Sequence, residues 1–218
     1  MDQTSTAANT SQIAIAKTML SLENQLKGGV SWFFWIAGLS IINSIIFFTG
    51  GSITFVVGLG ATQFIDGVVS GVVNKVSSGT GTIIRVIGYG LDFLLAGTFF
   101  TCGILGRKRL RWVVIGGMIL YGLDGLLALA FGDWLSTIFH VLALFGLWKG
   151  QKAIKELGLL EKNQSAGDLA AIQMMVKETQ PVSNGAPRKN LVRFLLIVTV
   201  PFLILLGVLI VMILLNYK

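Results

Sequence analysis

The sequence predicts an all-α, polytopic integral membrane helix bundle. Apolar residues make up 54% of the 218-residue chain, and charged residues make up only 12%. Soluble domains carry about 25% charged residues, so this chain has too few charges to cover a water-facing surface. The apolar residues also gather into long runs, several of which approach the roughly 20 residues that a helix needs to cross a bilayer.

Six apolar stretches are candidates for transmembrane helices. Five of them reach or nearly reach the required length: 30–49, 82–105, 112–131, 134–149 and 191–216. The sixth stretch, 53–73, is interrupted by polar residues: Thr54, Thr62, Gln63, Asp66 and Ser70. It is either a span buried among other helices or a re-entrant segment. We therefore expect six transmembrane helices, or five if the sixth stretch is re-entrant.

The chain divides into four regions: an N-terminal segment (1–28), a helix bundle (29–160), a polar cytoplasmic linker (161–190) and a C-terminal transmembrane helix (191–218). Within the first region, one face of a helix over 11–27 gathers Ile13, Ala16, Leu20 and Leu26. Such a helix is typical of an amphipathic segment lying in the membrane interface. In the linker, Asp168 is a candidate N-cap for a short helix over 169–178. The last helix carries no ionisable group after Arg193 and is expected to face lipid.

Basic residues predict the orientation of the bundle, because short cytoplasmic loops are enriched in Lys and Arg. One short loop carries four cations: Arg107, Lys108, Arg109 and Arg111. The turn at Gly132 and Asp133 has none and is expected on the outside, where Asp133 can cap the helix that starts at Trp134. The net charge is +7, but most of the basic residues lie between the apolar runs instead of forming a basic face. The sequence therefore predicts lipid contacts and no nucleic-acid binding.

Four ionisable residues fall inside the apolar runs: Asp66, Asp92, Asp124 and His140. A charged group at the centre of a bilayer costs roughly 2.5–3.5 kcal/mol on insertion scales, so we expect all four to face the bundle interior. Counting from the basic loop at 1.5 Å per residue places Asp92 and Asp124 at the same depth, roughly 20 Å away. We expect the four groups to share one polar layer, a candidate site for a proton or cation.

Neighbouring residues at helical spacing are candidate partners for this layer: Gln63, Arg85, Tyr89, Tyr121 and Thr137. The two tyrosines begin a short repeat, because residues 89–96 and 121–128 are identical at seven of eight positions. On oppositely running helices this repeat would form an inverted pair, a device used by many transporters. Gly67 and Gly71 form a small-xxx-small pair that predicts close helix packing.

The sequence carries no cofactor or metal motif, since one His and one Cys cannot supply the ligands of a zinc site. We expect a non-enzymatic accessory or assembly subunit of the cell membrane, packed against copies of itself or against other membrane subunits. A small transporter or channel for protons, cations or a small solute is the alternative. A second alternative is an intramembrane aspartyl-type enzyme, in which Asp92 and Asp124 would share a proton.

Overall fold

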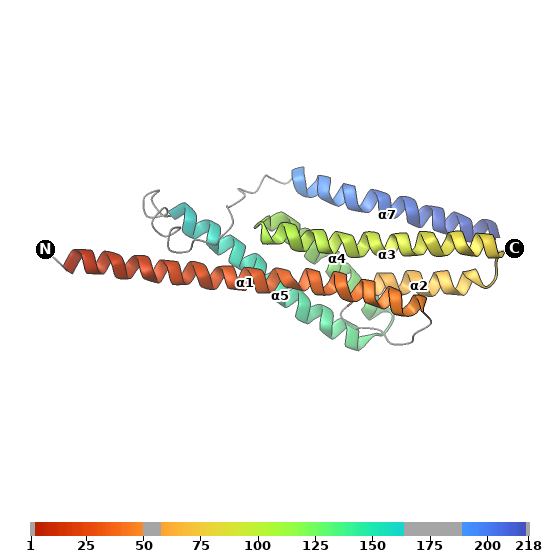
Figure 1. Cartoon of the computed structure of the whole chain (residues 1–218), viewed down its shortest axis with the longest axis horizontal. Helices are drawn as coiled ribbons and strands as arrows, with labels where there is room; N and C mark the ends of the chain where they lie inside the picture. The colour runs from red at the N-terminus through yellow and green to blue at the C-terminus, as the bar shows by residue number, and fades with distance from the viewer. Residues whose placement is uncertain (1–2, 50–57, 164–188, 217–218) are drawn as a thin grey trace.

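The computed structural model describes residues 3–49, 58–163 and 189–216, and every regular element in these ranges is a helix (Figure 1). The six described helices are α1 (Gln3–Phe48), α2 (Gly60–Val73), α3 (Ser78–Arg107), α4 (Arg111–Ala130), α5 (Trp134–Asn163) and α7 (Lys189–Asn216). The all-α prediction is confirmed. The short helix expected over 169–178 lies outside the described residues.

Three of the described helices are long and apolar enough to cross a membrane: Gln12–Phe48 within α1, together with α3 and α4. These helices indicate that the chain is a membrane protein, but the predicted bundle of six spans is not confirmed. The stretch predicted over 53–73 yields α2, which has 14 residues. At 1.5 Å per residue α2 is about 21 Å long, shorter than the roughly 30 Å of bilayer hydrocarbon. It is therefore too short to span as a helix of its own.

The helix expected over 11–27 and the span expected over 30–49 are one continuous element, α1, whose amino-terminal half extends beyond the bundle (Figure 1). Of the predicted apolar face, Ile13 and Leu20 are exposed on the protein, whereas Leu26 is buried. Leu26 belongs with Met19 and Leu22 to a buried cluster that includes the carboxyl-terminal half of α5. Packing against α5, which the sequence of α1 alone does not reveal, selects this face.

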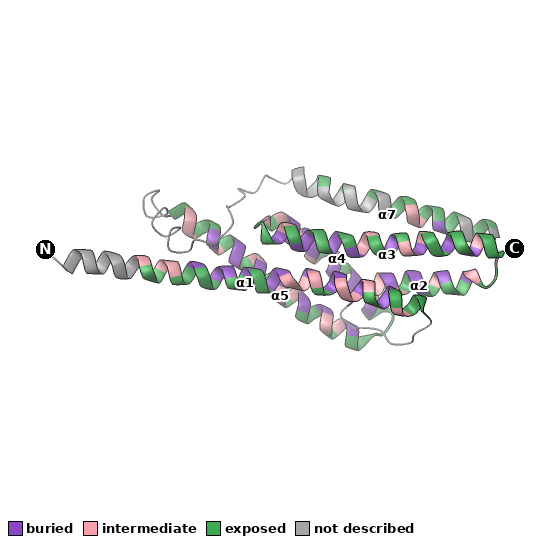
Figure 2. Ribbon diagram, viewed as in Figure 1, coloured by how far each residue is buried: buried purple, intermediate pink, exposed green. Residues whose placement is uncertain are grey.

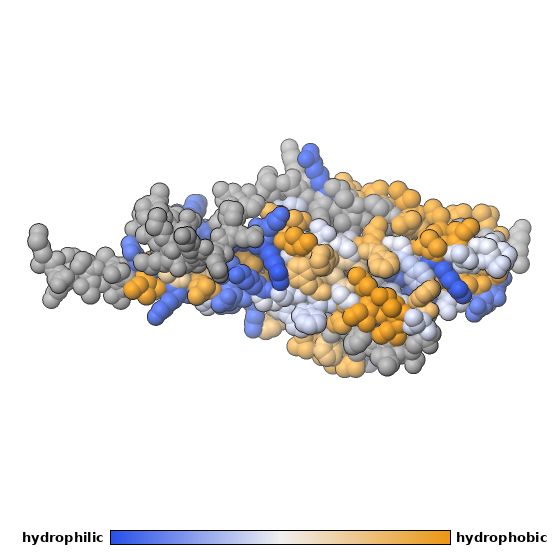
Figure 3. Space-filling model, viewed as in Figure 1, coloured by the Kyte–Doolittle hydropathy of each residue, from blue (hydrophilic) through white to orange (hydrophobic). Residues whose placement is uncertain are grey.

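Two apolar clusters hold the bundle together. The larger one joins α1, α3, α4 and α5 around Phe33, Phe99 and Tyr121. The smaller one joins α2, α3 and α7 and includes Leu209 of α7. The last helix is thus packed along α3 on one side, whereas Leu203 and Leu214 remain exposed (Figure 2). Figure 3 shows the resulting surface, on which apolar residues cover much of the bundle.

Glycines set the closest helix contact, where α1 crosses α5 (Figure 1). A Cβ atom added to Gly29 would lie 2.6 Å from the Gly150 Cα, and one added to Gly146 would lie 2.1 Å from the Trp32 Nε1. The predicted packing role of Gly67 and Gly71 is not observed, since a Cβ at either position meets no atom of the described residues within 4 Å. Both glycines are exposed on the surface of α2.

The basic loop between α3 and α4 contains a buried cation. Arg109 adopts a positive φ of 60° and is 8% exposed. Its guanidinium forms salt bridges with Glu23 of α1 and with Glu161 of α5, the latter at 2.8 Å. The prediction that all four cations of this loop only mark orientation therefore misses one structural role, because Arg109 ties the loop to two helices.

Candidate functional site

All four predicted polar residues are buried: Asp66 and Asp92 are 3% exposed, Asp124 is 7% exposed and His140 is 1% exposed. Their side-chain contacts form two separate centres. We call Asp124, His140 and the backbone amides of Gly60 and Ala61 the anchor centre. We call Asp66, Asp92 and the Ser44 hydroxyl the carboxyl pair. Each centre joins residues from three helices.

The anchor centre begins with the first turn of α2, whose backbone N–H groups have no partner within the helix. The N-cap residue Leu59 supplies no side-chain hydrogen bond. Asp124 on α4 replaces it: the Gly60 N–H donates to Oδ2 at 2.9 Å, and the Ala61 N–H donates to Oδ1 at 2.8 Å. The carboxylate also faces the positive end of the α2 dipole.

His140 on α5 completes the anchor centre. Its Nε2 lies 2.8 Å from Asp124 Oδ2, and its Nδ1 lies 2.7 Å from the carbonyl oxygen of Ser136. A neutral imidazole has one donor nitrogen, yet both nitrogens here face acceptors. Because Asp124 also accepts two backbone amides, the geometry fits an imidazolium paired with a carboxylate. The net charge of the centre is then zero.

Two residues in the second copy of the repeat, which contains Asp124, contact His140. The Tyr121 ring stacks on the imidazole with centroids 4.3 Å apart. A Cβ at Gly125 would lie 3.0 Å from the His140 Cβ, so the glycine makes room for the imidazole. The first copy of the repeat has the exposed Phe93 at the matching position. The two copies therefore have different roles, although their sequences are almost identical.

The carboxyl pair lies between α1, α2 and α3. The carboxyl groups of Asp66 and Asp92 lie side by side, with the Ser44 hydroxyl next to both. The Ser44 Oγ donates to Asp92 Oδ2 at 3.3 Å, whereas Asp92 Oδ1 is buried without a partner among the described residues. Two carboxylates this close repel each other when both are ionised, so a proton or cation held between them lowers the electrostatic cost.

Asp92 and Asp124, which the sequence analysis paired as a proton-sharing dyad, have different partners in the structure. Asp92 pairs with Asp66 and Asp124 pairs with His140. The prediction of one shared layer rests on depth along the helices, which does not determine which helix faces meet and so did not identify these partners. The pairing of Asp92 with Asp124 that the aspartyl-type alternative assumes is therefore not observed among the described residues.

The predicted supporting residues divide in the same way. Tyr121 contacts the anchor centre, whereas the Thr137 hydroxyl donates to the Asp133 carbonyl and Tyr89 packs edge-on against Phe48. Arg85 is exposed, and Gln63 lines a pocket. Among the described residues, no group of three or more His, Cys, Asp or Glu side chains could hold a metal ion.

Serines of α1 were missed by the sequence analysis. The Ser40 Oγ accepts the Leu59 N–H at 2.8 Å, and Ser44 belongs to the carboxyl pair one helical turn further on. Together with Asp124, Ser40 therefore fixes the start of α2. A signal was present in the sequence, because two serines at helical spacing interrupt the apolar run 30–49.

Comparison with protein-family models, curated proteins and solved structures gives no match. The function is therefore argued from the geometry of the two centres. The anchor centre satisfies the hydrogen-bonding capacity of its carboxylate. The carboxyl pair instead leaves a buried oxygen without a partner among the described residues.

Proposed function

We propose that this protein is a small membrane transporter or channel that binds a proton or a small cation at the carboxyl pair. One observation carries the proposal: Asp66 and Asp92 are buried side by side, and neither forms an ion pair with a basic side chain of the described residues. Ionisable groups inside membrane helices are rare and expensive, and they commonly mark ion or proton pathways.

The contrast between the two centres supports this assignment. Asp124 has three donors and a positive helix end, so its charge is compensated and it serves as a structural anchor. The carboxyl pair has one hydroxyl donor for two acids. Such a pair changes its net charge by one whenever it takes up or releases a proton. It is the better candidate for reversible binding.

Flux in proteoliposomes tests the proposal. The full chain is reconstituted around a pH-sensitive dye, and a potassium gradient with valinomycin sets the membrane potential. We expect proton entry above that of empty liposomes, and its loss in Asp66→Asn and Asp92→Asn. Ser40→Ala is the matched control, because it perturbs the start of α2 without removing a carboxyl. Wild-type flux equal to empty liposomes, or full flux in Asp92→Asn, contradicts the proposal.

A second candidate is the accessory or assembly subunit. The observation that favours it is the outward face of α2, where Gly67 and Gly71 meet no described neighbour and would allow another helix to approach closely. Pull-down in mild detergent with mass spectrometry distinguishes the two. Stoichiometric recovery of other membrane subunits, lost in Gly67→Leu, favours the accessory role. A chain recovered alone or as a homo-oligomer favours transport.

A further inference from the structure

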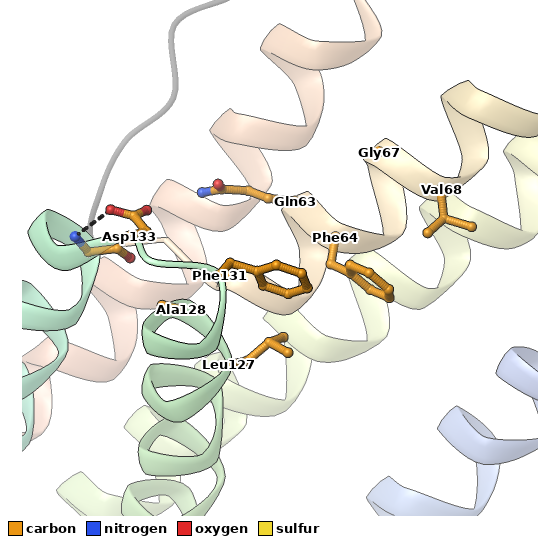
Figure 4. A pocket seen from close by; sticks show the side chains of 10 residues that line it. Gln63, Phe64, Gly67, Val68, Leu127, Ala128, Phe131 and Asp133 are labelled. Atoms are coloured by element: carbon orange, nitrogen blue, oxygen red, sulfur yellow. Dashed lines mark hydrogen bonds between the residues drawn. The ribbon is translucent and has the colours of Figure 1, made fainter.

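A pocket of about 440 Å³ opens between the start of α2, the end of α4 and the start of α5 (Figure 4). This volume lies within the roughly 300–1,000 Å³ of pockets that bind small ligands. Its walls differ in chemistry: Phe64 and Phe131 form an apolar side, whereas Gln63, Asp133 and Ser136 form a polar side. The pocket is separate from the carboxyl pair, none of whose residues line it.

The apolar wall is an aromatic surface. The rings of Phe64 and Phe131 are stacked, with centroids 5.6 Å apart and an angle of 26° between their planes. Both side chains are exposed, although they come from different helices. Stacked rings offer a flat face to an apolar or aromatic group, and the π face also attracts cations.

The polar side carries negative charge. Asp133 is the one charged residue among those that line the pocket. Its Oδ1 accepts the Ser136 N–H at 3.0 Å, as an N-cap of α5, and Figure 4 shows the Gln63 side chain directed toward it. The carboxyl-terminal end of α4 brings a negative dipole end to the pocket, whereas the starts of α2 and α5 bring positive ends that are capped by Asp124 and Asp133. With Asp133 as the one charged residue of its lining, this side favours a cation over an anion.

The anchor centre fixes the inner wall of this pocket. Gly60 lines the pocket while its N–H binds Asp124, and Ser136 lines it while its carbonyl faces His140. The relative positions of α2, α4 and α5 are thus set by hydrogen bonds directly behind the pocket. A site whose walls are held in place before the ligand arrives loses less entropy on binding.

We infer that this pocket binds a small organic ammonium ion with an aromatic or aliphatic body. The body stacks on Phe64 and Phe131, and the ammonium group lies at Asp133 and the Gln63 amide oxygen. An ammonium group offers only donors, which suits these two acceptors. The inference does not depend on proton binding at Asp66 and Asp92, so either can fail without the other.

Calorimetric titration of the full chain in lipid nanodiscs tests the inference with phenethylammonium as the probe. Phenethyl alcohol and phenylacetate serve as the neutral and anionic analogues of similar size. We expect saturable binding of the ammonium, and weaker or undetectable binding of both analogues. Asp133→Asn removes the charge but keeps an N-cap residue of equal quality, so α5 retains its start.

In Asp133→Asn we expect binding of the ammonium to weaken by about tenfold, a typical effect of losing one charge-assisted hydrogen bond. Phe131→Leu is expected to weaken binding by a separate route, through loss of the aromatic face. Asp133→Ser, which also keeps an N-cap residue, replaces the asparagine variant if that variant unfolds. Equal binding of the alcohol and the ammonium, or unchanged binding after loss of Asp133, overturns the inference.

Discussion

His140 Nε2 lies 2.8 Å from Asp124 Oδ2, so a buried ion pair joins α5 to α4. The same carboxylate accepts the first two backbone amides of α2, which makes it the meeting point of three helices. Asp124 thus caps a helix that begins 64 positions earlier in the chain. Asp124 therefore holds the start of α2 in place together with Ser40.

The first prediction concerns Asp124. Asp124→Ala leaves the His140 ring and two helix amides without their acceptor, and removing one member of a buried ion pair costs about 3–5 kcal/mol of unfolding free energy. Asp124→Asn keeps one acceptor oxygen and should lose less. Unfolding in mixed micelles, followed by circular dichroism, measures both. Thr101→Ala, at an exposed helix position, is the control, and an alanine variant as stable as this control contradicts the anchor role.

Arg109 carries the second prediction. Its salt bridges to Glu23 and Glu161 are buried, so Arg109→Ala is expected to cost about 3–5 kcal/mol. The Lys152–Glu156 pair on α5 is largely exposed, and Lys152→Ala should cost no more than about 0.5 kcal/mol. Unfolding free energies of the two variants in the same micelles test the difference. Equal losses would mean that water reaches the Arg109 site.

The burial of the four ionisable groups could be predicted from the sequence, because a charged group in an apolar run has to turn away from lipid. The structure buries all four groups that this argument selected. Their partners could not be found in the same way. Asp124 binds backbone amides of Gly60 and Ala61, and backbone groups are common to every residue. The residue types at these two positions do not distinguish their backbone amides from the neighbouring ones.

Glycine spacing shows the same limit. Gly67 and Gly71 have the four-residue spacing of a packing motif, but their side of α2 meets no described neighbour. The close crossing instead uses Gly29 together with Gly146 and Gly150, on helices far apart in the sequence. Spacing identifies one face of a helix, and only the tertiary arrangement decides which face meets another helix.

The third prediction compares two glycines. Gly29→Ala would place a methyl group 2.6 Å from the backbone of α5, which cannot move without shifting the helix. We expect a clear loss of stability from this variant, of the order of 1–3 kcal/mol for an overpacked contact. Gly67→Ala meets no described atom and replaces a helical glycine, so it should be neutral or stabilise by up to about 1 kcal/mol.

Melting temperatures of the two glycine variants in detergent measure this difference. If Gly67→Ala destabilises as much as Gly29→Ala, the outward face of α2 is packed against a neighbour after all. If the difference in melting temperature between Gly67→Ala and the wild type then disappears when both proteins are diluted, that neighbour is a second copy of the chain, because only association depends on concentration.

The fourth prediction is that one proton is held between Asp66 and Asp92 at neutral pH. Two buried carboxyls side by side would otherwise carry two negative charges, and no basic side chain of the described residues compensates the second. Infrared spectroscopy of the reconstituted protein is expected to show the carbonyl stretch of a protonated carboxylic acid. Asp66→Asn replaces the protonated acid by an amide of similar size that can donate the same hydrogen bond.

The Asp66→Asn variant is therefore expected to fold with a change in stability below about 1 kcal/mol, in the range of a single hydrogen bond, and to lose the acid band. Asp66→Leu is the contrasting variant, because it leaves Asp92 buried without a donor from α2 and should be destabilised by more. Asp124→Asn is the spectroscopic control: the two Asp124 oxygens accept backbone amides and take no part in the carboxyl pair, so the acid band should persist. An acid band that survives in Asp66→Asn and disappears in Asp124→Asn would assign the proton to the anchor centre instead.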